Sequence, residues 1–440
     1  TGDLLVVGET IARVGGVISD PHAQTIDAKG KYVLPGGIDV HTHFNLDVGI
    51  AVAQDDFYTG TVAAAIGGTT TIIDHPGFGP EGCSIFHQIK KYHAYAKDFA
   101  VIDYSFHGVL QHMDDQVLQE IPKLADQGIT SMKVYMTYDY MFNDAMLFNV
   151  FKAAKKSGVL IAVHAEDDVL IRNLRQKYIS EGKKEAKYHA KSRPVISEVD
   201  AVKRVLSQAM KADNAPVYIV HLSTGEGLSI IKKARESGQN VSVETCPQYL
   251  CLDETLYSLP NHEGLKYVMS PPLRSEKDQA ELWKGLADQV IAVVATDHCP
   301  FDYKLKKKIA SQDFSKCPGG VAGVEARVTL LYSRGVRDKK LTVQQFVKLM
   351  AENPAKIMGL YPEKGVIKKG SDADIIILDP QKKEVIKKRN LHENVDYSPY
   401  EGFEVYGWPC LTMVRGNIIV RDKVFIGKKG SGKFIKRKRI

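Results

Sequence analysis

The chain has 440 residues, of which 44% are apolar and 25% charged, as expected for a folded globular protein with a large core. It contains no apolar run of about 18 residues and no basic, cleavable start at Thr1–Thr10, so neither a membrane span nor a secretory leader is predicted. The net charge of +7 depends largely on two basic clusters, Lys304–Lys308 and Lys433–Arg439, which without a recognition motif indicate solvated or assembly surfaces rather than a nucleic-acid partner.

Both ends of the chain consist of short apolar runs separated by turns that contain glycine and aspartate. This pattern is typical of β-strands joined by tight turns. The expected strands are Asp3–Val7, Tyr32–Leu34, Ala373–Leu378, Leu411–Val414 and Ile418–Val420. Because they come from both termini, we predict one small β-sandwich domain formed by residues 1–35 and 363–430, followed by a basic tail at 431–440.

The middle of the chain alternates short β-branched runs with segments that carry helix-forming residues at helical spacing. The expected strands are Gly37–His43, Thr69–His75, Ala100–His107, Ile129–Met136, Val159–Glu166, Pro216–Ser223, Asn240–Pro247 and Val290–Cys299. The expected helices include Asp55–Ile66, Phe86–Ala96, Asp144–Lys156, Ser197–Ala212 and Gly225–Ser237. This alternation predicts an α/β fold, a (β/α)8 TIM-type barrel over residues 36–362. The segment Cys299–Gly323 is predicted to be a long loop at the barrel mouth.

Polar residues occupy the ends of several predicted barrel strands. They are His41 and His43 on the first strand, Lys133 on the fourth, His164 on the fifth, His221 on the sixth and Asp297 on the eighth. The carboxyl ends of barrel strands converge on one mouth, and the two imidazoles of a His-x-His strand point to the same face. The pattern therefore predicts a metal site. Other polar residues near strand ends are interpreted as supporting or packing groups: Asp74, His75, His107 and His298.

Lys133 is unusual because it lies within an apolar predicted strand, where an unpaired ammonium would be costly. An ammonium has only donors and cannot bind a metal ion. The neutral amine, however, reacts with CO2 to give a carbamate, whose two oxygens can each bind one ion. This carbamate, Asp297 and a bridging hydroxide would nearly balance the charge of two divalent ions. The alternative is an ordinary ammonium that extends to the barrel mouth.

Several motifs resemble those of the amidohydrolase superfamily, and of its hydantoinase/dihydropyrimidinase family in particular. They are Pro35–His43, Ser131–Tyr138, Val163–Glu166, Val220–Ser223, Ser270–Arg274, Thr296–Pro300, Gly323–Glu325 and Gly370–Asp374. The resemblance runs from about residue 3 to the C-terminus. Its metal motifs are specific to the superfamily, whereas its substrate motifs indicate this branch. It also implies one or two further strands before Thr1.

The resemblance implies a site with two metal ions, most often zinc in this family. The implied ligands are His41, His43 and Asp297 for one ion and His164 and His221 for the other, with carboxylated Lys133 bridging them. In the implied reaction, a hydroxide between the ions attacks a cyclic amide. Asp297 then carries the proton to the leaving ring nitrogen, and Tyr138 donates a hydrogen bond to the developing oxyanion.

The same resemblance implies the substrate contacts. Backbone groups of Ser270 and Gly319 would bind a cyclic ureide, and Tyr135 and Phe142 would line the pocket for its exocyclic substituent. Many hydantoinases have Pro-Asn-Gly-Gly where this chain has Pro318–Val321. A backbone contact survives that change, because glycine keeps the same N–H and C=O. The expected products are N-carbamoyl amino acids from hydantoins or N-carbamoyl-β-amino acids from dihydropyrimidines.

Three other functions agree with parts of the pattern. A dihydroorotase would have an arginine two positions after His-x-His to bind a ring carboxylate, but this chain has Asn45 there. An allantoinase has a similar site, and Tyr138 is the main residue that argues against it. A non-catalytic, dihydropyrimidinase-like assembly protein is disfavoured, because all six ligand positions are intact.

We expect a cytoplasmic location and a homotetrameric assembly. The six cysteines are scattered and contain no CxxC pair, which indicates reduced thiols and a cytoplasmic location. The segment Asn394–Gly402 resembles its counterpart in tetrameric relatives, so the resemblance implies a homotetramer. Apart from its own copies, the only partner expected is the small-molecule cyclic ureide, with no membrane and no nucleic acid.

Overall fold

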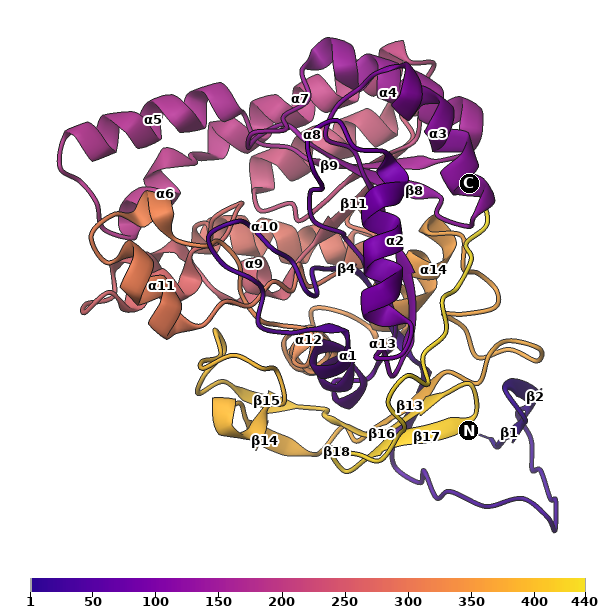
Figure 1. Cartoon of the computed structure of the whole chain (residues 1–440). Helices are drawn as coiled ribbons and strands as arrows, with labels where there is room; N and C mark the ends of the chain where they lie inside the picture. The colour runs from indigo at the N-terminus through magenta and orange to yellow at the C-terminus, as the bar shows by residue number, and fades with distance from the viewer. Residues whose placement is uncertain (1, 440) are drawn as a thin grey trace.

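A computed structural model describes residues 2–439, and its larger part is a parallel barrel (Figure 1). The barrel strands are β4 (Gly37–Thr42), β5 (Thr69–Asp74), β6 (Asp103–Phe106), β7 (Gly108–Val109), β8 (Ser131–Tyr135), β9 (Leu160–His164), β10 (Val217–Ile219), β11 (Val241–Thr245) and β12 (Val293–Val294). They form the sheets β4-β5-β6 and β7-β8-β9-β10-β11-β12. Only His107 separates β6 from β7, and a parallel bridge between Thr42 and His298 closes the circle. The predicted barrel of eight strand positions is confirmed.

Helices surround the barrel strands (Figure 1). They are α1 (Phe57–Ile66), α2 (Ile85–Ala96), α3 (Asp115–Asp126), α4 (Asp144–Ser157), α5 (Asp168–Ser180), α6 (Lys187–Ser192), α7 (Val195–Lys211), α8 (Gly225–Glu236), α9 (Pro247–Cys251), α10 (Glu276–Ala287), α11 (Tyr303–Ala310), α12 (Arg327–Leu331), α13 (Val343–Val347) and α14 (Asn353–Ile357). The α4 helix illustrates the local rules. Asn143 caps its first turn by accepting the N–H of Met146 at 3.0 Å, and Gly158 ends it in the left-handed region. The helices predicted from periodicity are confirmed.

The segment Cys299–Gly323 differs from its prediction as a long loop. It contains the helix α11, which begins at Tyr303 and ends at Ala310. Lys306 on this helix is fully buried, although its neighbours in the basic cluster are lysines at the surface. Composition cannot distinguish one buried lysine from its exposed neighbours in a run of lysines. The prediction of a solvated cluster is therefore wrong at Lys306.

The second part of the molecule is an antiparallel β region built from both ends of the chain. Its main sheet has the order β18-β17-β16-β13-β3. Its strands are β1 (Leu4–Val7), β2 (Thr10–Val14), β3 (Tyr32–Pro35), β13 (Ile375–Leu378), β14 (Lys383–Val385), β15 (Glu404–Tyr406), β16 (Pro409–Val414), β17 (Asn417–Arg421) and β18 (Val424–Phe425). The β1-β2 hairpin packs its apolar face on the main sheet through a separate core cluster. The predicted sandwich of both termini is confirmed, whereas its boundaries at residues 35 and 363 stay a prediction.

A buried lysine joins the β region to the barrel. The ammonium of Lys364 lies 2.8 Å from Asp103 on β6, 2.7 Å from Asp374 and 3.0 Å from Asp372. Burial alone would lower the pKa of Lys364, but the three carboxylates outweigh it and raise the pKa. The three aspartates are close enough to hold a cation, and Lys364 supplies that positive charge itself.

The end of the chain lies along the barrel instead of extending into solvent. In Figure 1 this yellow segment rises from the β region toward α3. Phe434 forms a parallel bridge with Tyr104 of β6. The side chain of Arg437 is buried and donates to the Ser105 hydroxyl at 3.0 Å and to the carbonyl of Phe106 at 2.6 Å. The expectation of a solvated basic cluster is therefore wrong at Arg437.

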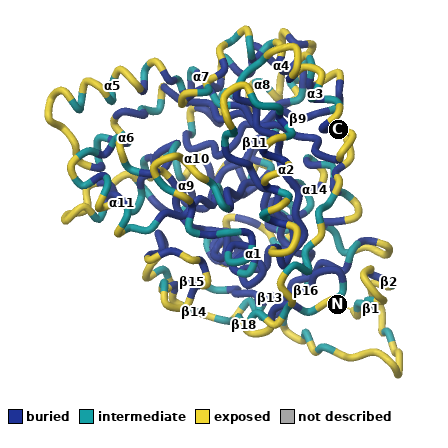
Figure 2. Tube along the Cα trace, viewed as in Figure 1, coloured by how far each residue is buried: buried dark blue, intermediate teal, exposed yellow. Residues whose placement is uncertain are grey.

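Burial is concentrated in the barrel strands, whereas α5 and the turns near the N-terminus are largely exposed (Figure 2). Within residues 2–439, no helix combines the length and the apolar composition needed to cross a membrane. The six cysteines, all in the described part of the chain, are unpaired thiols.

Candidate functional site

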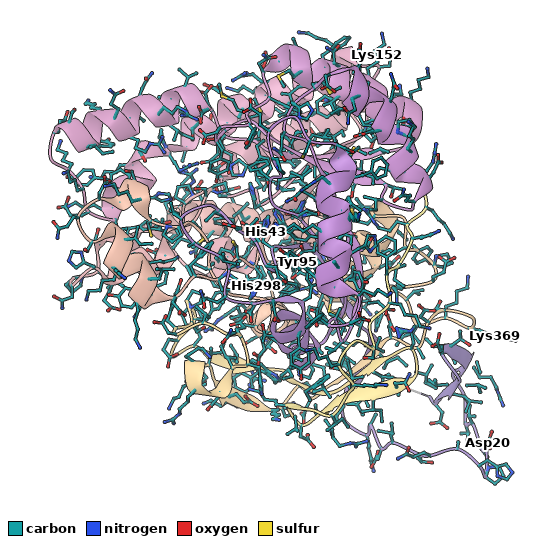
Figure 3. The ribbon with its side chains drawn as sticks, in the orientation of Figure 1. Asp20, His43, Tyr95, Lys152, His298 and Lys369 are labelled. Atoms are coloured by element: carbon teal, nitrogen blue, oxygen red, sulfur yellow. The ribbon has the colours of Figure 1, made fainter. Side chains whose placement is uncertain are left out.

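Three predicted metal ligands, contributed by the first and the last strand of the barrel, lie close together at the barrel mouth. His41 and His43 lie at the end of β4, and Asp297 follows β12. The Oδ1 atom of Asp297 lies 3.1 Å from Nε2 of His41 and 3.0 Å from Nε2 of His43. Burial alone would raise the pKa of Asp297, but the two imidazoles outweigh it and hold the pKa well below its usual range. Figure 3 places His43 near the centre of the view, and its side chain is buried.

The other three predicted ligands lie beside this group. His164 ends β9 and His221 follows β10, and their facing nitrogens are 2.9 Å apart. The ring of His221 lies 5.4 Å from that of His41, measured between centroids. Lys133 on β8 is buried, with Nζ 3.4 Å from Nε2 of His41. Burial lowers the pKa of Lys133 to about 8. The structure thus brings all six predicted positions together.

Two buried glutamates hold the outer nitrogens of these imidazoles. Glu244 contacts Nδ1 of His41, and Glu166 lies 2.8 Å from Nε2 of His164. A carboxylate binds the N–H of each ring, which leaves the lone pair of the opposite nitrogen directed into the site. Burial would raise the pKa of Glu166, but Arg193 and His164 lower it to about 2.

The residues present therefore fit a divalent cation. The acceptor nitrogen of His41 lies beside the Oδ1 atom of Asp297, and positive charge between these two acceptors would be favourable. Sequence reasoning did not identify Glu244 as a supporting residue. A glutamate inside the otherwise buried strand Val241–Thr245 was the available signal.

The sequence model of the Amidohydrolase family matches residues 32–419. The chain belongs to this family. It is 49% identical over 438 residues to D-phenylhydantoinase of Escherichia coli O9:H4 (strain HS), which covers 99% of this chain and 94% of that protein. Among solved structures, dihydropyrimidinase from Brevibacillus agri NCHU1002 is 41% identical with a TM-score of 0.98. D-hydantoinase from a Bacillus sp. AR9 is 43% identical with a TM-score of 0.97, and both comparisons cover 99% of this chain and 95% of the other.

Membership makes the protein a hydrolase and implies a divalent metal site. Of the other histidines predicted as supporting groups in this amidohydrolase, His107 and His298 are held by hydrogen bonds, whereas both ring nitrogens of His75 are buried without a partner among the described residues. Both ring nitrogens of His107 and of His298 take part in hydrogen bonds, so neither ring has a nitrogen free for a metal. His75 stacks on His107 with ring centroids 3.9 Å apart and lies 4.3 Å from the ring of His41.

Three residues of the amidohydrolase site have a strained backbone. The φ angles of Tyr138, His221 and Asp297 are 71°, 39° and 53°, in the left-handed region that side chains other than glycine rarely adopt. Such residues cost about 1–3 kcal/mol each and persist where the surrounding structure fixes them. All three residues lie two or three positions beyond the end of a barrel strand, where strand periodicity alone does not predict the backbone.

Aromatic residues from β8 and from the loops after β5 and β8 lie together beside the predicted ligand His164. The ring of Tyr138 lies 5.4 Å from the ring of His164 and 5.9 Å from that of Tyr135. Phe78, which sequence reasoning missed, contacts Tyr135 at 5.2 Å between centroids. Phe142 is only 2% exposed and belongs to the core, so its place in a substituent pocket stays a prediction.

The predicted backbone contacts lie on two adjoining segments. The nearest atom to a Cβ added at Gly319 is the Cα of Met269, at 3.8 Å, and Ser270 is the next residue. Gly319 is exposed, with a φ angle open to any residue. Gly320 has a φ of 146°, and a Cβ there would meet the carbonyl of Cys299 at 2.3 Å. Glycine is thus required at Gly320 and not at Gly319.

Proposed function

We propose that this amidohydrolase opens the ring amide of 5-substituted hydantoins or of dihydropyrimidines, giving N-carbamoyl amino acids or N-carbamoyl-β-amino acids. The observation that carries the proposal is the convergence of four imidazoles, one carboxylate and one buried lysine at the barrel mouth. The relatives named as hydantoinases and a dihydropyrimidinase support the choice of a cyclic amide. We also propose a homotetramer, on the resemblance of Asn394–Gly402.

The proposed cofactors are two divalent ions, with zinc favoured because imidazole and carboxylate are ligands it accepts. They would be held by His41, His43, His164, His221, Asp297 and carboxylated Lys133. When bound, such ions activate water at neutral pH and polarise a carbonyl. Burial favours the neutral amine of Lys133, which is the form that reacts with CO2.

The chain's own residues would carry out the remaining chemistry. Asp297, whose pKa is held low, is a carboxylate at neutral pH and accepts the proton of the attacking water. It then delivers that proton to the ring nitrogen as the amide bond breaks. Tyr138 donates its phenolic O–H to the oxygen on which negative charge develops.

The pocket is expected to discriminate against a ring carboxylate. The side chain of Asn45 accepts the N–H of Phe57, the first residue of α1, at 3.1 Å. No arginine is available at this position to pair with a carboxylate. We therefore expect kcat/KM for 5-phenylhydantoin or dihydrouracil to exceed that for dihydroorotate by about 10- to 100-fold, the value of one charged hydrogen bond. An assay across these substrates and allantoin tests this. Equal or faster turnover of dihydroorotate would overturn the assignment.

Replacing Gly319 with asparagine is expected to preserve ring opening. A Cβ added at Gly319 meets no atom closer than 3.8 Å, and the substrate contact is proposed to use the backbone. Because the variant restricts the loop before binding, KM should fall about 2- to 5-fold, with kcat changed less. Steady-state kinetics check this. A ligand complex with the Gly319 backbone far from the ring would contradict it.

A further inference from the structure

Lys306 is a buried lysine that the proposed reaction does not use. It lies on α11 with none of its surface exposed, and among residues 2–439 it forms no ion pair with a carboxylate. Its ammonium donates to the carbonyl of Gly320 at 2.6 Å, to that of Val268 at 3.2 Å and to that of Lys266 at 3.3 Å. The hydroxyl of Tyr397 is a fourth partner at 3.3 Å. Lys306 therefore binds backbone oxygens rather than a countercharge.

These carbonyls belong to the two segments that carry the predicted substrate contacts. Val268 precedes Ser270 by two positions, and Gly320 directly follows Gly319. The two segments are also joined to each other, since the N–H of Gly320 donates to the carbonyl of Val268 at 3.0 Å. Both polar groups of the Gly320 residue are thus fixed, one by Val268 and the other by Lys306.

Packing alone does not require an ammonium at this position. A buried charge without a counterion is costly, and burial lowers the pKa of Lys306 to about 8. The ammonium instead provides several N–H donors, which bind carbonyl oxygens from two separate segments at once. Gly319 and Gly320 have no side chains with which to hold their own loop, so its position depends on such backbone bonds.

We propose that Lys306 is a positioning residue that fixes the spacing between the backbone groups of Ser270 and Gly319, and thereby sets the affinity for a cyclic ureide. The inference rests on the proposed function for the identity of the ligand. The geometry on which it stands is independent of the metal site.

Lys306→Met tests the proposal, because methionine has a similar length and no donor. We expect KM for 5-phenylhydantoin to rise about 10-fold, the value of a charged hydrogen bond, with kcat within about 3-fold of the wild type. Lys306→Gln keeps two N–H donors and should restore most of the affinity. Lys307→Met removes an exposed lysine from the next position and should change neither constant.

A milder variant covers the case in which Lys306→Met does not fold. Tyr397→Phe removes the fourth partner of the ammonium and the hydroxyl that donates to Lys266 at 2.7 Å. It should raise KM about 3-fold, in the range expected for one neutral hydrogen bond. An unchanged KM in both Lys306→Met and Tyr397→Phe would overturn the proposal. A fall in kcat as large as the rise in KM in both variants would also overturn it.

Hydrogen–deuterium exchange provides a measurement that does not depend on activity. Lys306→Met should speed exchange in residues 266–270 and 318–321, with the barrel strands unchanged and with Lys307→Met showing no effect. Unaltered exchange in these segments would refute the positioning role. If the wild-type chain opened no cyclic ureide, the proposed function would fail while this measurement still decided whether Lys306 holds the two segments.

Discussion

Replacing Lys133 with alanine is expected to remove bound metal and activity together. Lys133 is buried beside His41, and burial lowers its pKa to about 8, which favours the neutral amine from which the proposed carbamate would form. The carbamate would then join the ligands of the two ions. Removing a residue that hydrogen-bonds to a metal ligand typically lowers metal affinity by roughly 10- to 100-fold. The loss of metal affinity in Lys133→Ala should exceed this, because the variant removes a ligand itself. Metal analysis and a ring-opening assay on the same preparation measure both quantities.

Two controls separate the carbamate from a general effect of the cavity. Lys133→Glu restores a carboxylate and should retain more metal than the alanine variant. Wild-type protein reconstituted with zinc should need bicarbonate for full activity, because the modification consumes CO2. In a crystal structure the carbamate oxygens should lie ~2.0–2.2 Å from the ions, as zinc–oxygen bonds do. An ordered, unmodified ammonium in metal-loaded active enzyme would refute the proposal.

Replacing Tyr138 with phenylalanine is expected to lower kcat by about 10²–10³, the usual cost of one oxyanion donor. KM should change much less, because the hydrogen bond strengthens only as charge develops. The backbone already holds this residue in position. Its N–H donates to Asp168 at 3.2 Å, and its carbonyl accepts from Arg172 at 3.1 Å. Steady-state kinetics with a 5-substituted hydantoin measure the effect.

Tyr140→Phe is the matched control for this variant. Tyr140 is a nearby tyrosine whose ring packs on Phe78, 4.7 Å away between centroids, and the proposed reaction does not use its hydroxyl. It should retain wild-type kcat. If Tyr138→Phe also kept near-normal kcat, the role assigned to Tyr138 would be wrong and the argument against an allantoinase would weaken.

The fold could be predicted because its signals are local and repeated. Most barrel strands are short runs that contain β-branched residues, and most of the long helices place apolar residues at helical spacing. The six ligand positions could be predicted for a related reason, since strand ends in a barrel share one mouth. The alternation therefore locates His41 and Asp297 near each other, although they are far apart in the sequence.

The supporting residues, the backbone of Tyr138 and the burial of Arg437 could not be predicted, because they depend on contacts between residues that are far apart in the sequence. Glu244 on β11 supports His41 on β4, which is not a neighbouring strand, and Lys306 binds carbonyls that carry no sequence signature. The positive φ of Tyr138 is imposed by Asp168 and Arg172, which follow it by more than 25 residues. Within a basic cluster, Arg437 is indistinguishable by composition from its exposed neighbours, and only the docked segment shows that it is buried.

The segment that ends near Arg437 also constrains how the barrel is completed during synthesis. The hydrogen bond from Arg437 to Ser105 joins residues 332 positions apart. At ribosomal rates of roughly 5–20 residues per second, β6 therefore waits about 15–65 s for this partner. During that interval its outer edge exposes unpaired backbone groups, which are sites for pairing with other nascent chains. The terminal segment thus covers backbone groups of β6 that would otherwise stay open to such pairing.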